Sequence, residues 1–474
     1  MITPDLTQCT VSELRDLYAR REASPVEAVD ACLRRIKTLN PDLNAFVLVD
    51  PEGARAAARE AERRLAGNSH IPPLLGIPAS VKDNIMTAGL RSSSGSRLFR
   101  DFVPSEDAGV VKALKRAGAI VIGKTNTSAF GWNATTLNMV YGPSRNPHDR
   151  SRASGGSSGG AAVSAAAGLT PINIGTDGGG SLRVPAAFTG TVGFKPSYGR
   201  VPDTPPHTHW IIQHYGPVAR RVSDIALTLA AIAGPDARDP GSLPATAIAI
   251  EPIARPLRVL FTTQLGYVAR VEAEIATRCR DAALSMRELG WTVMEEDLAW
   301  PDPAPFANVI AAAGLARRLR PFADRLDQVE DGIRDAVRRA ETFGPHDFYD
   351  ACLAWREWCA HSANLFDEID LLITPTTACQ PFAFDKTGPD TIDGYPVAPG
   401  AWTAFLRAFN LTGQPAISVP CGTTATGMPI GMQIVGPRHG DNLVLAAAAA
   451  FERLRPWKVA WSPDDMKNET GRTA

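Results

Sequence analysis

Serines alternate with two glycine-rich turns in one stretch, residues 155–183, which reads GGSSGGAAVSAAAGLTPINIGTDGGGSLR. Glycine turns let the backbone approach closely and direct successive N–H groups to one place, which favours an anion. A serine hydroxyl beside such a turn has what acyl transfer requires: a nucleophile and donors for the oxyanion. Ser157, Ser158 and Ser181 are therefore candidate functional residues.

Other interpretations explain this stretch less well. A flexible Gly/Ser linker would not need its runs of Ala, Val and Ile. A phosphate-binding loop would need GxxxxGK[ST], but Gly180 is followed by Ser181 and Leu182. A G-x-S-x-G nucleophile elbow does not fit either, because Arg183 stands where its second glycine should be.

A serine nucleophile needs a base, and none of the eight histidines has a recognisable triad context. Lys82, in GIPASVKDNI, follows an apolar run where burial would lower its pKa and free the amine to act as a base. A snorkelling lysine or an ion pair with Asp83 is the alternative. His207 and His209 are two positions apart, but no carboxylate or third histidine completes a metal site, so we expect a Pro-rich loop and no metal.

The elements that must position these residues alternate between strands and helices. This alternation predicts an α/β fold: a mixed, mostly parallel central sheet covered by helices on both faces. Capping boxes start two helices, at Thr10 with Glu13 and at Ser24 with Glu27. Apolar runs predict strands at 77–81, 119–122, 172–174, 191–194, 258–261, 371–373, 417–419 and 432–435. Periodicity predicts further helices at 51–66, 108–116, 161–167, 224–233, 271–289, 348–369 and 442–454.

The composition is that of an ordinary globular protein. The chain has 474 residues, 44% hydrophobic and 21% charged, with a net charge of −1, which gives no reason to expect nucleic acid or an anionic membrane as a partner. Seven scattered cysteines without CxxC suit free thiols in a reducing compartment. No signal-peptide pattern and no apolar run of about 20 residues occur, so we expect a cytoplasmic protein.

Several long blocks, in the right order, resemble the amidase signature family. They are GIPASVKDNI, the stretch GGSSGG…DGGGSLRVPAAFTGTVGFKPSYGRV, GPVARRVSDIA, and FNLTGQPAISVPCG…GMPIGMQIVGP. The family's two catalytic serines are 24 positions apart, as Ser157 and Ser181 are here. The resemblance implies the amidase signature fold and a Ser–cis-Ser–Lys triad, with Ser181 as nucleophile, Ser157 as cis-serine and Lys82 as base.

The resemblance also implies a cis peptide bond between Gly156 and Ser157. It implies an oxyanion hole made by the backbone N–H groups of Gly178, Gly179, Gly180 and Ser181. The family often has Thr where Gly178 stands, so a differently shaped acyl pocket is one consequence. Ser158 is expected to support its turn by hydrogen bonds, and Asp177 and Arg183 are expected to be structural.

We expect one amidase signature domain over residues 1–474. Within it, residues 1–67 form an N-terminal helical segment, 68–235 the core with the catalytic residues, 236–369 a variable helical region that shapes the substrate pocket, and 370–474 the C-terminal part of the core. The predicted reaction is hydrolysis of an amide C–N bond through an acyl-enzyme, without a cofactor. Ester or carbamate cleavage would follow the same chemistry.

One branch of the family is the glutamine-hydrolysing A subunit of a tRNA-dependent amidotransferase. Its carboxylate-binding arginine motif is missing from residues 333–358, and Thr403 stands where it has an aspartate. We therefore expect a neutral, hydrophobic or aryl small-molecule substrate, with Trp132 and Gly156 as candidate substrate-binding residues and aromatic loops at 208–215 and 394–405 nearby. The amidotransferase subunit and a non-catalytic scaffold or binding relative remain alternatives, and the resemblance makes a homodimer one expected assembly.

Overall fold

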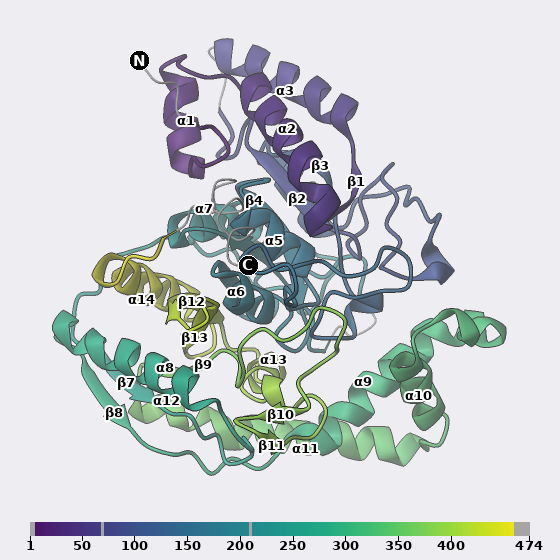
Figure 1. Cartoon of the computed structure of the whole chain (residues 1–474), viewed down its shortest axis with the longest axis vertical. Helices are drawn as coiled ribbons and strands as arrows, with labels where there is room; N and C mark the ends of the chain where they lie inside the picture. Colours follow the sequence, from purple (N-terminus) through teal and green to yellow (C-terminus); the bar gives the residue numbers. More distant parts are fainter. Residues whose placement is uncertain (1–4, 68–70, 208–210, 459–474) are drawn as a thin grey trace, which may run out of the picture.

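The computed structural model describes residues 5–67, 71–207 and 211–458, and an eleven-stranded mixed sheet runs through them (Figure 1). A separate two-stranded hairpin pairs β10 (Thr391–Ile392) with β11 (Tyr395–Pro396). In spatial order the large sheet contains β1 (Phe46–Val49), β3 (Ile120–Thr125), β2 (Pro78–Lys82), β4 (Ile172–Asp177), β6 (His214–Ala219), β5 (Val192–Lys195), β12 (Ala416–Thr423), β13 (Pro429–Val435), β9 (Leu371–Pro375), β7 (Arg258–Phe261) and β8 (Thr292–Glu295).

Parallel pairing forms two blocks of this sheet, β3–β2–β4 and β9–β7–β8. The strands between the blocks pair antiparallel with their neighbours, as β1 does at its edge. Parallel neighbours end at the same edge of a sheet. The carboxyl ends of β2 and β4, Lys82 and Asp177, therefore lie at one edge, and this edge carries the site.

Helices cover both faces of the sheet (Figure 1). One face carries α1 (Val11–Ala19), α4 (Gly109–Arg116), α7 (Val222–Ile232), α8 (Ala273–Ser285) and α14 (Asp441–Leu454). The other carries α2 (Pro25–Leu43), α3 (Pro51–Ala66), α5 (Gly159–Ala166), α6 (Arg183–Thr189) and α13 (Arg407–Leu411). A further helical group comprises α9 (Ala304–Leu319), α10 (Asp331–Ala340), α11 (Pro345–Ala363) and α12 (Leu365–Glu368).

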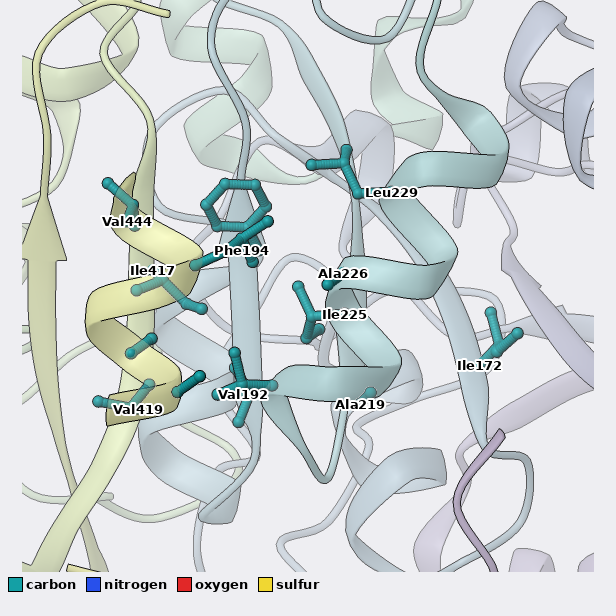
Figure 2. Packing of buried hydrophobic residues seen from close by; sticks show 14 of the residues in the cluster. Ile172, Val192, Phe194, Ala219, Ile225, Ala226, Leu229, Ile417, Val419 and Val444 are labelled. Atoms are coloured by element: carbon teal, nitrogen blue, oxygen red, sulfur yellow. The ribbon is translucent and has the colours of Figure 1, made fainter. Parts of the chain in front are cut away.

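The core under α7 and α14 shows why these segments are helical. Ile225, Ala226 and Leu229 recur at helical spacing and are buried against the sheet, where they meet Phe194 of β5 and Ile417 of β12 (Figure 2). Fully burying such an aliphatic side chain contributes roughly 1.5–3 kcal/mol. The apolar faces of the helices thus determine how the helices pack on the sheet. This packing in turn determines where the polar ends of the strands lie.

The sequence-based expectations for the fold are confirmed in outline. The α/β class with a mixed, helix-covered sheet is present, every predicted strand and helix is found within a few residues of its expected ends, and both capping boxes form. Sequence patterns missed β1, β6, β8, α6, α9, α10 and α13. The seven cysteines are free thiols. Among the described residues, no helix is both long and apolar enough to cross a membrane.

Candidate active site

The turn that carries Ser181 is held by the last residue of β4. Asp177 Oδ1 accepts a hydrogen bond from the Gly180 N–H at 2.7 Å, and its Oδ2 accepts one from the Leu182 N–H at 3.1 Å. Arg183, the first residue of α6, donates Nη2 to Oδ1 at 2.9 Å and Nε to Oδ2 at 3.0 Å. One carboxylate therefore fixes both sides of the turn around Ser181.

This carboxylate is buried and forms an ion pair with Arg183. Burial by itself would raise the pKa of Asp177, but Arg183 and Asn410 hold it well below its usual range. Asn410 donates Nδ2 to Asp177 Oδ1 at 2.9 Å, and Arg183 donates Nη1 to Gln433 Oε1 at 2.7 Å. A buried ion pair of this kind is costly unless its remaining hydrogen bonds are satisfied, as they are here. The expected structural role of Asp177 and Arg183 is confirmed.

Ser158 ties the GGSSGG turn to the DGGGS turn, which carries Ser181. The Ser158 N–H donates to the carbonyl oxygen of Ser181 at 3.1 Å, and its hydroxyl donates to the carbonyl oxygen of Thr176 at 3.0 Å. The peptide bond between Gly156 and Ser157 is cis, as the resemblance implies. Ser157 is thus held next to the turn of Ser181, and Ser158 has the supporting role that the sequence predicted.

Lys82 ends β2 and reaches Ser157 across the sheet edge. Its Nζ lies 2.7 Å from Ser157 Oγ and 2.7 Å from Thr176 Oγ1. Asp83, the alternative partner, instead accepts hydrogen bonds from Ser93. Burial lowers the pKa of Lys82 well below its ordinary value, and Asp177 offsets this only in part. A lysine in this setting can stand as a neutral amine and accept a proton.

Exposure separates the roles of the three side chains. Lys82 is 0% and Ser157 1% exposed, whereas Ser181 is 8% exposed. All three residues are buried, Ser181 is the most exposed of them, and Ser157 contacts Lys82. The contact of Lys82 Nζ with Ser157 Oγ places a base beside a buried hydroxyl, which is one requirement of nucleophilic catalysis.

The three glycines of the DGGGS turn have different surroundings. A Cβ on Gly180 would lie 2.5 Å from Leu406 Cδ1, and Gly180 has a φ of +110°, so glycine is required there. A Cβ on Gly178 would meet only Gln213 Oε1, at 3.5 Å, and one on Gly179 only Arg407 Nε, at 3.9 Å, among the described residues. The side of the turn at Gly178 and Gly179 is therefore open.

The hydrogen bonds correct one oxyanion prediction. The Gly180 N–H already donates a hydrogen bond to Asp177 Oδ1, so it is not free to donate one to an oxyanion. Within the described part of the chain, the N–H groups of Gly178, Gly179 and Ser181 have no protein acceptor. These three groups are the donors left for a developing oxyanion.

The substrate-binding candidates Trp132 and Gly156 fall in different places. Trp132 is half-buried and packs with Phe130 and the apolar side of α9, giving an apolar wall. Its neighbour Gly131 lies against the site, because a Cβ there would be 3.3 Å from Ser157 Oγ. Gly156 is packed against backbone, with a Cβ position 2.4 Å from the carbonyl carbon of Thr135. Substrate contact by Trp132 and Gly156 stays a prediction.

The aromatic side chains of the two loops that were expected near the site have different surroundings. Trp402 in the 394–405 loop is 1% exposed and stacks on Phe188, with ring centroids 5.6 Å apart, so it belongs to the core. Tyr395 of the same loop is exposed under Arg270. In the 208–215 loop, Tyr215 donates to Asp203 at 2.9 Å. Residues 208–210, including His209 of the histidine pair, lie outside the described residues.

Sequence reasoning missed several polar residues of the site. Thr176, beside Asp177 in β4, is the second partner of Lys82. Asn410, Gln213 and Arg407 reach the DGGGS turn from distant segments. Thr176 lies in the same stretch as the serines, and Gln213 lies in the 208–215 loop that the sequence analysis expected near the site. The others depend on pairings between remote parts of the chain.

The chain is similar to known proteins over almost its whole length. The model of a family described as Amidase matches residues 27–445. An acylamidase of Rhodococcus erythropolis is 33% identical, covering 96% of this chain and 98% of that protein. The A subunit of glutamyl-tRNA(Gln) amidotransferase from Roseiflexus castenholzii is 36% identical, covering 96% of this chain and 97% of that protein.

A solved structure gives the same picture. The structure of a bacterial aryl acylamidase belonging to the amidase signature enzymes superimposes with a TM-score of 0.89 at 31% identity. The match covers 98% of this chain and 99% of that chain. The likeness thus extends over the whole fold and includes the segments that carry Lys82, Ser157 and Ser181.

Proposed function

Because the chain belongs to the amidase signature family, whose enzymes hydrolyse amides, we propose that it cleaves a linear amide C–N bond through an acyl-enzyme on Ser181. The observation that carries this proposal is the contact of buried Lys82 Nζ with Ser157 Oγ, 2.7 Å, beside the turn of Ser181. Neither partner of this contact is exposed, so a solvated surface role does not explain it.

In the proposed reaction, neutral Lys82 accepts a proton from Ser157 while Ser157 accepts the proton of Ser181. Ser181 Oγ then bonds to the amide carbon, and the carbonyl oxygen becomes an oxyanion held by the N–H groups of Gly178, Gly179 and Ser181. The proton returns along the same path to the amine nitrogen as the C–N bond breaks. Water attacks the acyl-enzyme, releases the acid and restores Ser181.

The acyl group is proposed to be apolar or aryl where it meets Trp132 and the apolar side of α9. The acylamidase and aryl acylamidase relatives support this choice. Ester and carbamate cleavage would follow the same steps. We place the enzyme in the cytoplasm, in keeping with its free cysteines, and expect a small molecule as its partner, with a homodimer as one assembly.

The glutamine-hydrolysing subunit is the second candidate, because a protein of that kind is 36% identical. Its missing arginine motif and the threonine at 403 weigh against it. The direct test compares release of ammonia from glutamine with release of 4-nitroaniline from acyl 4-nitroanilides. The proposal predicts release of the aniline and no ammonia. The reverse result would favour the amidotransferase subunit.

The acyl-enzyme itself is tested with hydroxylamine, which competes with water for it. Turnover of an anilide in its presence should yield the acyl hydroxamate. Ser181→Ala should lose both products, while the exposed control Ser151→Ala should keep them. Anilide turnover that survives in Ser181→Ala would refute the proposed nucleophile, and no turnover of any amide, ester or carbamate by folded protein would favour a non-catalytic relative.

A further inference from the structure

A positively charged side chain stands at the open side of the DGGGS turn. Arg407 begins α13, and its Nε lies 3.9 Å from the position that a Cβ of Gly179 would occupy. Its side chain is half-buried, so part of it remains accessible. The mechanism proposed above makes no use of Arg407, although the Gly179 N–H beside it is one of the three free donors.

Arg407 has a neutral partner and no acidic one. Its Nη1 donates to Asn308 Oδ1 of α9 at 2.6 Å. Among the described residues, no carboxylate lies within 4.0 Å of its guanidinium. Asp302 is the acidic group that acts on it electrostatically, but this carboxylate caps the start of α9 by accepting from the Ala304 N–H at 2.8 Å.

The neighbouring Arg183, unlike Arg407, forms an ion pair with a carboxylate, that of Asp177. Arg183 donates hydrogen bonds to Asp177, Asn410, Gln433 and the carbonyl oxygen of Leu406. Arg407 is half-buried, and among the described residues its guanidinium has one hydrogen-bond partner, Asn308. A guanidinium so placed without an anion loses hydration that its protein partner only partly replaces.

A second polar group in the same cluster also lacks a partner. The hydroxyl of Tyr267 is buried and makes no hydrogen bond within the described part of the chain. The Tyr267 side chain packs against the apolar cluster that contains Leu406 and Ala408, the two chain neighbours of Arg407. A buried unpaired hydroxyl costs free energy, and such groups are rare in folded proteins. Among the described residues, the cluster therefore holds a cation that hydrogen-bonds only a neutral amide and a hydroxyl that has no hydrogen bond.

We propose that Arg407, with Tyr267 beside it, binds a carboxylate of the amide substrate next to the oxyanion turn. This inference rests on the proposed amide hydrolysis and names its substrate class: amides with a carboxylate a few bonds from the scissile carbonyl. Guanidinium and carboxylate match in shape and charge and form paired hydrogen bonds. The sequence predicted a neutral substrate because the amidotransferase arginine and aspartate are missing, but Arg407 supplies a cation from a different segment.

The test uses two pairs of anilides that differ in charge and not in shape. On the acyl side, succinyl 4-nitroanilide is compared with 4-methylpentanoyl 4-nitroanilide. On the amine side, 4-acetamidobenzoate is compared with 4-isopropylacetanilide. Wild type should prefer the carboxylate in at least one pair. Arg407→Gln should lower kcat/KM for that carboxylate about 10- to 100-fold and change the isostere less than about threefold.

Arg317→Gln is the control, because Arg317 is an exposed arginine of α9, the helix that carries Asn308, the partner of Arg407. It should leave the preference unchanged, and Arg407→Lys should keep part of it. Equal turnover of both members of both pairs, or a loss in Arg407→Gln that is the same for carboxylate and isostere, would overturn the inference while leaving amide hydrolysis intact.

A binding measurement makes the test independent of turnover. Calorimetry on Ser181→Ala should show tighter binding of the preferred carboxylate than of its isostere. Ser181→Ala with Arg407→Gln should abolish the difference. If Ser181→Ala binds neither carboxylate better than its isostere, the proposed subsite is wrong whether or not the enzyme is active. If the difference is present but wild type cleaves no anilide, the subsite stands and the proposed reaction fails.

Discussion

Lys82 Nζ and Ser157 Oγ are 2.7 Å apart although 75 positions separate the two residues in the chain. The sheet makes this contact possible, because β2 and β4 run parallel and end at the same edge. The turn between β4 and α6 then brings Ser181 to that edge. The proposed chemistry depends on this contact.

The state of charge of Lys82 sets the pH dependence. Burial lowers its pKa well below 10.5, and the reaction needs the neutral amine. The neutral form prevails above the lowered pKa, so kcat/KM should rise with pH through that value and then level off well before pH 10.5. A pH–rate profile for an anilide checks this. A rise that continues to the pKa of an ordinary lysine would contradict it.

The same shift predicts an effect on stability. Between the lowered pKa and 10.5 the folded state binds fewer protons than the unfolded state, so burial of Lys82 costs stability at neutral pH and the cost fades as pH rises towards 10.5. Lys82→Met should therefore unfold at a higher temperature than wild type at pH 7 while losing activity. Equal midpoints at pH 7, measured by thermal unfolding, would argue against a desolvated lysine.

Thr176 should position the base. Its hydroxyl is the second partner of Lys82 Nζ, at 2.7 Å, and valine has the same shape without the hydroxyl. Thr176→Val should lower kcat about 10-fold, the equivalent of one hydrogen bond, with little change in KM. It should also shift the pH profile. Thr228→Val, which removes a buried hydroxyl on α7, is the control and should leave kcat unchanged. A pH profile identical to wild type in Thr176→Val would assign Thr176 a purely structural role.

Two glycines of the DGGGS turn should respond differently to a methyl group. Gly180→Ala would meet Leu406 at 2.5 Å with a φ of +110°, so the turn must move and kcat/KM should fall at least about 100-fold. Among the residues that the structure describes, Gly178→Ala would meet only Gln213 Oε1, at 3.5 Å, and it should stay within about threefold of wild type. Anilide turnover of the two purified variants tests the pair. Comparable losses in both would mean that the open side of the turn has been misassigned.

Much of this arrangement could be predicted from sequence because its signals are local. Apolar runs identified the strands that carry Lys82 and Asp177, and the resemblance to the amidase signature family singled out Ser157 and Ser181. β6 was missed because Gly216 and Pro217 interrupt its pattern, since both residues are poor strand formers.

The remaining parts of the site depend on tertiary structure. Nothing near Asn410 or Arg407 in the sequence indicates that both approach the DGGGS turn. The occupied N–H of Gly180 could not be foreseen either, because it depends on how the Asp177 carboxylate turns in the fold. Local patterns therefore identify the catalytic residue types, while substrate recognition is decided by contacts between distant segments.

The most direct test of the central claim is intact mass after exposure to a fluorophosphonate, which modifies activated serine hydroxyls. Wild type should gain one adduct. Ser181→Ala should gain none, and Ser157→Ala and Lys82→Ala should react far more slowly, because each breaks the path of the proton. An adduct that persists in Ser181→Ala, or labelling of folded Lys82→Ala at the wild-type rate, would contradict the proposed Ser181–Ser157–Lys82 relay.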